Sequence, residues 1–361
     1  MKIVKVNLKK RSYDIIIGYN ITGLLGRYIS KLNLGSDAYV ITTSPIKNRY
    51  GAILNKALQQ SGIKSRFRVV PDSEKSKSIE IAASVIKDIA HYDRKKRLFI
   101  IGFGGGMVGD LSGFIASVYK RGTPYIQIPT TLLAQVDSSI GGKTAVDLTE
   151  GKNLIGAFYQ PRLVFSDIRF LKSLSQRQLS AGLAEIIKYG IIKDSKLFAY
   201  LEKRYREILS SKPKALGYVI ANSSRIKADI VGRDEREERG IRTILNFGHT
   251  IGHALEAAGN FRTYNHGEAI ALGMVIASDI SRLLNLINGS EFSRIERLIK
   301  AVGLPVRIKK ASLDNIINAH YRDKKFIGSK NRFVLISGIG RARIKENISL
   351  SIIKEAIKKR F

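Results

Sequence analysis

The chain has 361 residues, no cysteine, and 62 Lys and Arg against 30 Asp and Glu, which gives a formal net charge of +32. A chain of this length exceeds the usual size of one hydrophobic core, so we expect two domains. Without cysteine there is neither a disulfide nor a thiolate ligand, and a bound metal would need His, Asp or Glu side chains. No apolar run approaches the roughly 20 residues of a membrane-spanning helix, and the N-terminus lacks a signal-peptide pattern. We therefore expect a cytoplasmic protein without a membrane partner.

The positive charge has two interpretations. Basic surfaces neutralise the phosphates of nucleic acids, and they also attract small anionic substrates. Lys and Arg residues are spread along the whole chain and are not gathered in one tail or stripe. We therefore favour an anionic small-molecule substrate over nucleic acid.

Strand and helix patterns alternate through the first part of the chain. Residues 2–6 and 13–17 alternate between apolar and polar side chains, as short strands do. Further strands are predicted at 37–43, 65–71 and 97–103, with helices at 44–62 and 78–92. This alternation predicts βαβ crossovers and a parallel sheet.

A glycine-rich turn follows the strand predicted at 97–103. Gly104, Gly106 and Gly109 match the pattern GxGxxG, and residues 110–119 have a helical pattern. In this context glycines let the backbone approach a pyrophosphate, which binds the unpaired N–H groups at the helix start. The downstream acidic residue that would hold a ribose is missing, so a tight turn without a ligand is the alternative.

Two lysines further along the chain stand next to glycines. Lys143 follows two consecutive glycines, and Lys152 lies between a glycine and Asn153. Backbone amides together with an ammonium group suit a phosphate. In so basic a chain a lysine is often merely solvated, and the flanking glycines and Asn153 are what favour phosphate binding.

After residue 167 the pattern becomes helical almost throughout. Helices are predicted at 176–189, 195–208, 214–231, 243–258, 267–286 and 290–301. We therefore expect an α/β domain with a parallel sheet at residues 1–167 and a mostly α-helical domain at residues 168–361.

Three of the five histidines, His249, His253 and His266, lie close together in the sequence. On a helix His249 and His253 would share one face, and His266 opens the next predicted helix, so a helical hairpin would bring the three together. Imidazole is the commonest protein ligand for zinc and related metals. Glu185, three residues before Lys188 among apolar neighbours, is the candidate anionic ligand. The alternatives are hydrogen-bonded core histidines and a surface ion pair between Glu185 and Lys188.

These motifs together resemble the 3-dehydroquinate synthase family of sugar phosphate cyclases. In family order, the segments that carry the resemblance are PDSEKSK, GGGMVGDLSGFIASVYKRG, IPTTLLAQVDSSIGGKTAVD, GKNLIGAFYQP, GLAEIIKYG, RTILNFGHTIGHALE, NHGEAIALGM and a late DKK. The resemblance implies an N-terminal Rossmann-like NAD-binding domain, a helical C-terminal metal-binding domain, an active site in the cleft between them, and a homodimer.

The resemblance also implies a reaction. Members of the family convert 3-deoxy-D-arabino-heptulosonate 7-phosphate to 3-dehydroquinate and phosphate, in the shikimate pathway of aromatic amino-acid biosynthesis. The implied enzyme is an NAD- and metal-dependent carbon–oxygen lyase that combines transient oxidation, phosphate elimination, reduction and an intramolecular aldol closure. Zinc and cobalt both suit such a site. A cyclase acting on another sugar phosphate and a metal-dependent polyol dehydrogenase are the alternative functions.

By motif position, the resemblance assigns the metal to Glu185, His249 and His266. It implies NAD contacts for Asp72, Ser73, Glu74, Lys75, Ser76, Lys77, Gly106, Met107, Val108, Gly109, Asp110, Thr130, Thr131, Lys143 and Lys152, and Thr43 with the residues next to it is a further candidate. It implies substrate contact or catalysis for Asp137, Lys143, Lys152, Asn153, Lys188, Lys227, Arg242, Asn246, His253, one of Lys324 and Lys325, and Arg121, which would reach the partner subunit. Lys188 and His253 are the candidates for proton handling.

Overall fold

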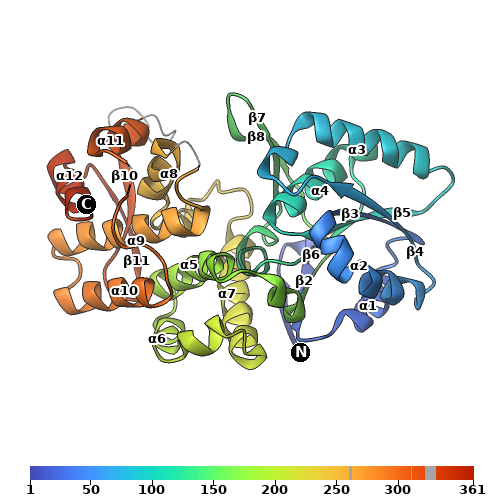
Figure 1. The fold of residues 1–361 in the computed structure, drawn as a ribbon, viewed down its shortest axis with the longest axis horizontal. Helices are drawn as coiled ribbons and strands as arrows, with labels where there is room; N and C mark the ends of the chain where they lie inside the picture. The colour runs from blue at the N-terminus through green and yellow to red at the C-terminus, as the bar shows by residue number, and fades with distance from the viewer. Residues whose placement is uncertain (260–261, 310, 322–330) are drawn as a thin grey trace. The chain divides into compact units, whose positions relative to one another are not determined.

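The computed structural model describes residues 1–259, 262–309, 311–321 and 331–361. Contacts within the chain divide it into two compact units (Figure 1). The first unit comprises Met1–Leu174 and Leu216–Arg236, and the second comprises Ser175–Ala215 and Glu237–Phe361. Lys324 and Lys325 lie outside the described residues.

This division differs from the predicted one at residue 168. Residues 168–174 and 216–236 group with the first unit, although they lie after the predicted boundary and 214–231 is predicted as a helix of the second domain. The contacts explain this, since the Lys227 Nζ atom lies 2.7 Å from Asp137 Oδ1 and the Ser224 hydroxyl contacts the Gln135 carbonyl oxygen at 3.5 Å. A helical pattern predicts a helix without showing which unit the helix packs against.

The first unit is built on a seven-stranded sheet with the strand order β1-β2-β9-β6-β5-β3-β4. Its strands are β1 (Lys2–Val6), β2 (Tyr13–Gly18), β3 (Asp37–Thr43), β4 (Lys64–Val70), β5 (Leu98–Gly104), β6 (Tyr125–Pro129) and β9 (Leu163–Asp167). β1 pairs with β2 antiparallel. All other neighbouring strands of the sheet pair parallel, as predicted. The connection from β1 to β2 is short, so the chain reverses there, whereas an α-helix lies between each two consecutive strands from β2 to β6.

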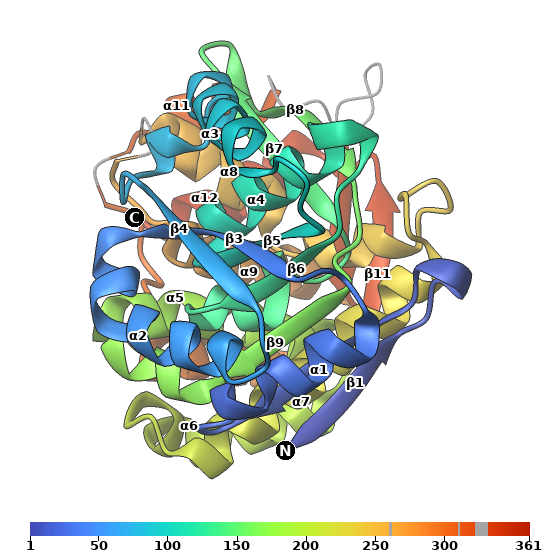
Figure 2. The same cartoon turned by 90° about the vertical axis from the view of Figure 1, so that its right-hand side faces the viewer.

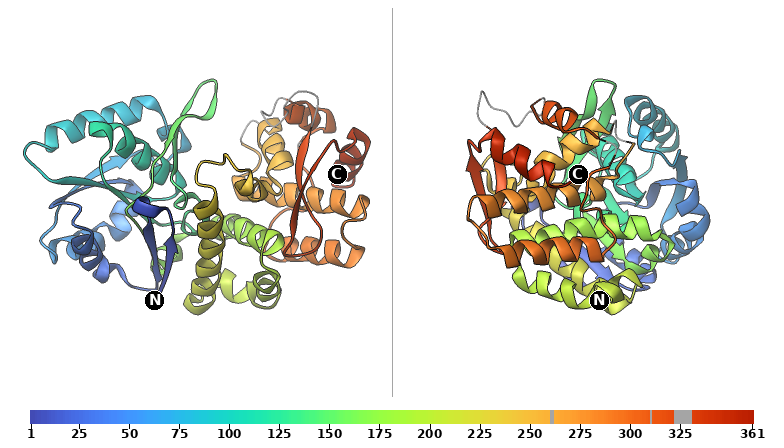
Figure 3. Two further views of the ribbon diagram at one scale, coloured as in Figure 1. Left: turned by 180° about the vertical axis from the view of Figure 1, so that it is seen from behind. Right: turned by 60° about the vertical axis from the view of Figure 1, so that its left-hand side comes forward.

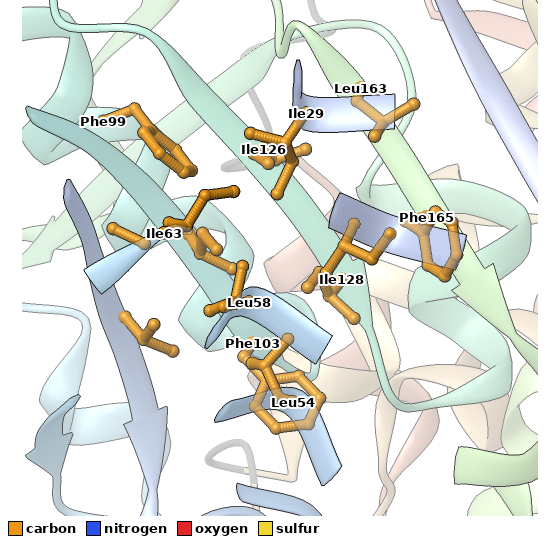
Figure 4. Packing of buried hydrophobic residues seen from close by; sticks show 14 of the residues in the cluster. Ile29, Leu54, Leu58, Ile63, Phe99, Phe103, Ile126, Ile128, Leu163 and Phe165 are labelled. Atoms are coloured by element: carbon orange, nitrogen blue, oxygen red, sulfur yellow. The ribbon is translucent and has the colours of Figure 1, made fainter. Parts of the chain in front are cut away.

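Helices cover both faces of this sheet (Figure 2). On one face lie α1 (Leu25–Leu32) and α2 (Ser44–Gln59), and on the other α3 (Ile79–Tyr92) and α4 (Gly106–Val118). Neighbouring strand residues face opposite sides of the sheet: Phe99 belongs to the buried cluster that includes Leu54 of α2 and Phe165 of β9 (Figure 4), while Ile100 belongs to a second cluster with Ile115 of α4. A sheet buried on both faces explains why its central strands are continuous apolar runs.

A separate antiparallel hairpin of the first unit consists of β7 (Lys143–Leu148) and β8 (Gly151–Phe158). Before it stands η5 (Ala134–Ser138), which is a π-helix. The shorter 3-10 helices of this unit are η1 (Lys9–Arg11), η2 (Thr22–Leu24), η3 (Glu74–Ser76), η4 (Tyr119–Arg121) and η6 (Ile168–Ser173).

The second unit is mostly helical, as predicted (Figure 3). Its helices are α5 (Gln176–Ile192), α6 (Ser195–Leu209), η7 (Ile241–Asn246), α8 (His249–Ala258), α9 (His266–Leu283), α10 (Gly289–Ala301), α11 (Leu313–Tyr321) and α12 (Leu350–Lys358). Helix α7 (Pro213–Arg233) crosses into the first unit at Leu216. Helix α9 packs against α5, α8, α10, α12 and β10, which explains its almost continuous burial.

Two features of this unit differ from the prediction. The helix predicted at 243–258 is interrupted between η7 and α8, where Gly248 has a left-handed backbone with φ 78°. An antiparallel hairpin of β10 (Arg332–Ile336) and β11 (Ala342–Glu346) was not predicted. Within the described part of the chain, none of the helices combines the length and apolar character needed to traverse a bilayer.

Candidate metal and cofactor sites

Glycines let three helices of the second unit approach one another closely. A Cβ atom on Gly273 of α9 would lie 1.9 Å from the backbone oxygen of Gly248, which precedes α8. A Cβ atom on Gly267 of α9 would lie 2.4 Å from the backbone of Ala181 in α5. Because glycine has no side chain, α5 and α8 can both pack directly on α9. This close packing brings together side chains of α5, α8 and α9 that lie near the helix contacts.

Glu185 of α5, His249 at the start of α8 and His266 at the start of α9 form one such cluster. Their ligand atoms all lie within 4.8 Å of one another. The Nε2 atoms of His249 and His266 lie 3.6 Å and 3.5 Å from the same oxygen, Oε1 of Glu185. Two imidazoles and one carboxylate are a donor set that zinc and related divalent ions accept, so the residues present fit a metal ion.

His249 and His266 are the first residues of α8 and α9, and local contacts hold each of them in place. His266 follows Asn265, whose side chain and that of Glu268 form a reciprocal cap at the start of α9. The Nδ1 atom of His249 lies 3.1 Å from the Phe247 carbonyl oxygen. When Nδ1 carries the proton and donates it to this carbonyl, the lone pair of His249 Nε2 is directed toward Glu185.

Lys188 lies one turn after Glu185 on α5, and its ammonium group is ion-paired with Glu185 Oε2. The Lys188 side chain is 2% exposed and that of Glu185 is fully buried, so the alternative of a surface ion pair is wrong. Burial and then the nearby Lys188 ammonium hold the pKa of His249 well below its usual range. His249 is therefore neutral near pH 7, which is the form that binds a metal.

His253 is exposed and stands one turn after His249, with its ring centroid 5.3 Å from that of His249 and 6.4 Å from that of His266. The predicted convergence of the three histidines is confirmed. However, the potential ligand atoms of His253 lie within 4.8 Å of those of Glu256 and His266, in a group that does not include Glu185. Sequence reasoning missed Glu256, although it lies three residues after His253 on the same helix and so on the same face.

Two further candidates lie in η7. Arg242 is buried, and its Nε atom is 3.3 Å from a carboxylate oxygen of Glu237. Asn246 is half-buried at the end of η7, three residues before His249. Both residues therefore belong to the segment that leads into the metal cluster.

In the first unit, the glycine turn is a backbone cradle at the start of α4. Helix α4 begins at Gly106 directly after β5, and not at residue 110 as predicted. A Cβ atom on Gly105 would lie 3.2 Å from the Thr131 side chain, and one on Gly106 would lie 3.0 Å from the Ser138 hydroxyl. The first turn of a helix has unpaired N–H groups, so this bare turn fits the pyrophosphate of a dinucleotide.

Three motifs of the first unit meet at Lys77, which is almost fully buried. Its Nζ atom lies 2.5 Å from Asp110 Oδ2 and also donates a hydrogen bond to Asn153 Oδ1. The backbone of Asn153 is left-handed, with φ 57°, and its N–H donates to Asp147 at 2.7 Å. Burial raises the pKa of Asp110 to about 6, although the Lys77 ammonium opposes the rise. Lys77 thus links the predicted NAD-binding turn to Asn153 of the hairpin.

A second lysine of this unit is held by the π-helix. Lys227 Nζ donates to the Asp137 carbonyl oxygen at 2.8 Å and to Asp137 Oδ1 at 2.7 Å. Asp137 lies inside η5, and π-turns within helices are frequent at functional sites. Asp137 and Lys227, which were predicted separately, therefore form one ion pair.

The remaining candidates of the first unit occupy varied positions. Ser73 caps η3, and Ser76 donates to the Pro71 carbonyl oxygen at 2.7 Å. The Thr130 N–H donates to the Gly104 carbonyl oxygen at 2.9 Å, and the Thr131 hydroxyl accepts from the Ala134 N–H at 3.2 Å. Thr43 is buried before α2, whereas Asp72, Ser73, Glu74, Lys75, Arg121, Lys143 and Lys152 are exposed.

Comparisons with known proteins agree with the motifs. Residues 67–181 match the family described as 3-dehydroquinate synthase N-terminal, and residues 182–326 match 3-dehydroquinate synthase C-terminal. The 3-dehydroquinate synthase of Thermoanaerobacter pseudethanolicus is 43% identical over 98% of this chain and 100% of the relative.

Two solved structures are similar along nearly their whole length. A 2-deoxy-scyllo-inosose synthase complexed with carbaglucose-6-phosphate, NAD+ and Co2+ is 26% identical, with a TM-score of 0.91 and full coverage of both chains. A 2-epi-5-epi-valiolone synthase from Streptomyces hygroscopicus with NAD+ and Zn2+ bound is 27% identical, with a TM-score of 0.88, and covers 98% of this chain and 97% of its own. The predicted fold and family are confirmed: this chain belongs to the 3-dehydroquinate synthase family.

Proposed function

We propose that the chain converts 3-deoxy-D-arabino-heptulosonate 7-phosphate to 3-dehydroquinate and phosphate, as a step of aromatic amino-acid biosynthesis. The observation that carries the proposal is the 43% identity to 3-dehydroquinate synthases over nearly the full length of both chains. Cyclases named for other products are only 26% and 27% identical, although their folds match closely. The identity therefore favours this substrate over another sugar phosphate.

The cofactors we propose are NAD+ and one divalent ion, zinc or cobalt. Glu185, His249 and His266 would hold the ion, which supplies Lewis-acid activation of a substrate hydroxyl. The turn at Gly106–Asp110 would hold the pyrophosphate of NAD+, which supplies transient hydride acceptance and return. Solved relatives contain NAD+ with Co2+ in one case and Zn2+ in the other, and the donor set fits both ions.

In the metal cluster, Lys188 and His253 have different tasks in this proposal. The buried Lys188 ammonium neutralises Glu185 and stabilises negative charge that develops on nearby oxygen atoms. His253 lies beside the ligand cluster and is exposed, so its imidazole can take up and return a proton. Arg242 and Asn246 would bind polar groups of the substrate from η7.

The first unit supplies the charges that an anionic substrate needs. Lys143 and Lys152 are exposed on the hairpin of β7 and β8, and Asn153 is held there by Lys77. Lys227 is oriented by Asp137. Ammonium groups and an amide in such settings suit a phosphate and a carboxylate, the two anionic groups of the proposed substrate.

A homodimer is part of the proposal. The same hairpin exposes Leu148, Leu154, Ile155 and Phe158 by 36% to 42% each. Several exposed apolar side chains on an uncovered strand pair are typical of an interface. A second copy of the chain would cover this hairpin, and Arg121 would reach the site of the partner subunit. Light scattering coupled to size exclusion would give twice the monomer mass if the proposal is correct.

Phosphate release tests the proposed reaction. Purified protein is incubated with 3-deoxy-D-arabino-heptulosonate 7-phosphate, catalytic NAD+ and zinc or cobalt, with and without a chelator. The proposal predicts phosphate release that the chelator stops, without net accumulation of NADH. NADH formed without phosphate would instead indicate a polyol dehydrogenase, and release only from another sugar phosphate would indicate a different cyclase.

A further inference from the structure

Glu256 lies on the opposite side of the His266 ring from Glu185. Its carboxylate oxygen Oε1 is 3.5 Å from His266 Nδ1, while His266 Nε2 is 3.5 Å from Glu185 Oε1. The Glu256 side chain is 13% exposed and sits on α8, which packs directly on α9 where His266 begins. The imidazole of His266 is therefore placed between two carboxylates, one at each ring nitrogen.

In both histidines of the ligand cluster, an oxygen atom lies near ring nitrogen Nδ1. His249 has the Phe247 carbonyl oxygen there, and His266 has the Glu256 carboxylate. A partner at Nδ1 decides which nitrogen carries the proton and which way the ring faces. A carboxylate in this position also makes the other nitrogen a stronger electron donor.

We propose that Glu256 is a positioning residue of the metal site: it accepts the Nδ1–H of His266 and so directs the Nε2 lone pair of that ring at the ion shared with Glu185 and His249. The inference rests on the metal site proposed above. Glu256 contacts the ion only through His266. Its removal would leave the three ligands in the chain while loosening one of them.

Cobalt binding to the metal-stripped full chain tests this proposal. The variants are Glu256→Ala, which removes the acceptor, and Glu256→Gln, which keeps an acceptor oxygen but not the charge. Glu207→Gln is the matched control, since Glu207 is an exposed, ion-paired glutamate on α6 of the same unit. Affinity is measured by competition with a chelator and followed by the visible absorption of bound Co2+.

We expect Glu256→Ala to weaken Co2+ binding by about 10- to 100-fold, with a smaller loss for Glu256→Gln and none for Glu207→Gln. In the zinc-loaded wild type, imidazole NMR should show slowly exchanging Nδ1–H signals for both His249 and His266. Glu256→Ala should lose the His266 signal and keep that of His249, which a general loss of structure would not do. If Glu256→Ala does not fold, Glu256→Gln should still show weakened Co2+ binding with the His266 signal retained.

Unchanged Co2+ affinity and both Nδ1–H signals in Glu256→Ala would overturn the proposal. Two Co2+ ions per wild-type chain, falling to one in Glu256→Ala, would also overturn it, because Glu256 would then be a ligand of a second ion formed with His253 and His266. Failure of the wild type to bind Co2+, or unchanged binding in Glu185→Gln, would instead contradict the metal site itself.

Discussion

Lys77 and Asp110, 33 residues apart in the sequence, form a 2.5 Å hydrogen-bonded ion pair at the glycine turn of the first unit. The pair joins the loop before α3 to the first turns of α4. Burial raises the pKa of Asp110 to about 6, against an ordinary value of 3.8, although Lys77 acts in the opposite direction. The carboxyl therefore binds its proton more tightly in the folded chain than in the unfolded chain.

The pH dependence of stability follows from this difference. The contribution of Asp110 to the free energy of unfolding is fully present below about pH 4 and is lost as the pH rises to about 6, because only the folded state then holds the proton. We expect a loss of about 1 to 3 kcal/mol over this interval. The Asp110→Asn variant should not show this loss of stability. Urea unfolding of both proteins at several pH values gives the free energy of unfolding as a function of pH. If this free energy changes equally in the wild type and in Asp110→Asn between pH 4 and 6, the prediction is wrong.

His266 is predicted to be required for metal binding. Replacing it with alanine removes one of three ligands and the contact to Glu185 Oε1. We expect His266→Ala to lose zinc or cobalt on gel filtration and to lose turnover with it. Metal analysis and the phosphate-release assay check the two losses, and full activity in this variant would refute the ligand assignment.

His253 provides the contrasting case within the same cluster. It lies beside His249 but outside the ligand group that contains Glu185. We expect His253→Ala to keep its metal while kcat falls by about 10²- to 10⁴-fold, the usual contribution of a general acid or base. Metal content and steady-state kinetics on the same preparation distinguish the two histidines. Loss of metal in His253→Ala would show that it is a ligand.

Lys188 is predicted to stabilise the chain most when the metal is absent. Removing one partner of a buried ion pair costs about 3 to 5 kcal/mol, because the other charge stays buried without compensation. Lys188→Met should therefore be strongly destabilised in chelator. Zinc should reduce the difference in stability between the wild type and Lys188→Met, since the ion then compensates the charge of Glu185. Denaturant unfolding with chelator and with zinc gives both values, and the double variant Glu185→Gln with Lys188→Met should recover much of the stability lost in chelator.

Gly273 is predicted to be necessary for the close packing of α8 and α9. An added Cβ would lie 1.9 Å from the Gly248 backbone oxygen, so the helices would have to separate. We expect Gly273→Ala to destabilise the chain by at least about 2 kcal/mol and to weaken metal binding. Gly289→Ala is the control, because an added Cβ there meets nothing within 4 Å. It should leave the stability equal or raise it by up to about 1 kcal/mol. Equal stability of the two variants would contradict the prediction.

The sequence alone determined most of the local structure. Apolar alternation predicted β1 and β2, and helical periodicity predicted α2, α3, α5, α6 and α9 to within a few residues, because each pattern reports the buried faces of its own element. The spacing of His249 and His253 likewise placed them on one face of a helix. These features depend on neighbours within a few residues, which the sequence displays directly.

Only the tertiary structure decided which residues meet across elements. The residue pattern alone left Glu185 and Lys188 open to a surface ion pair, and it gave no role to Glu256. It also assigned residues 216–236 to the second domain, whereas they pack with the first unit. Close approach at Gly267 and Gly273 sets which helix faces touch. Periodicity identifies a buried face, but the partner of that face depends on long-range packing that no single segment encodes.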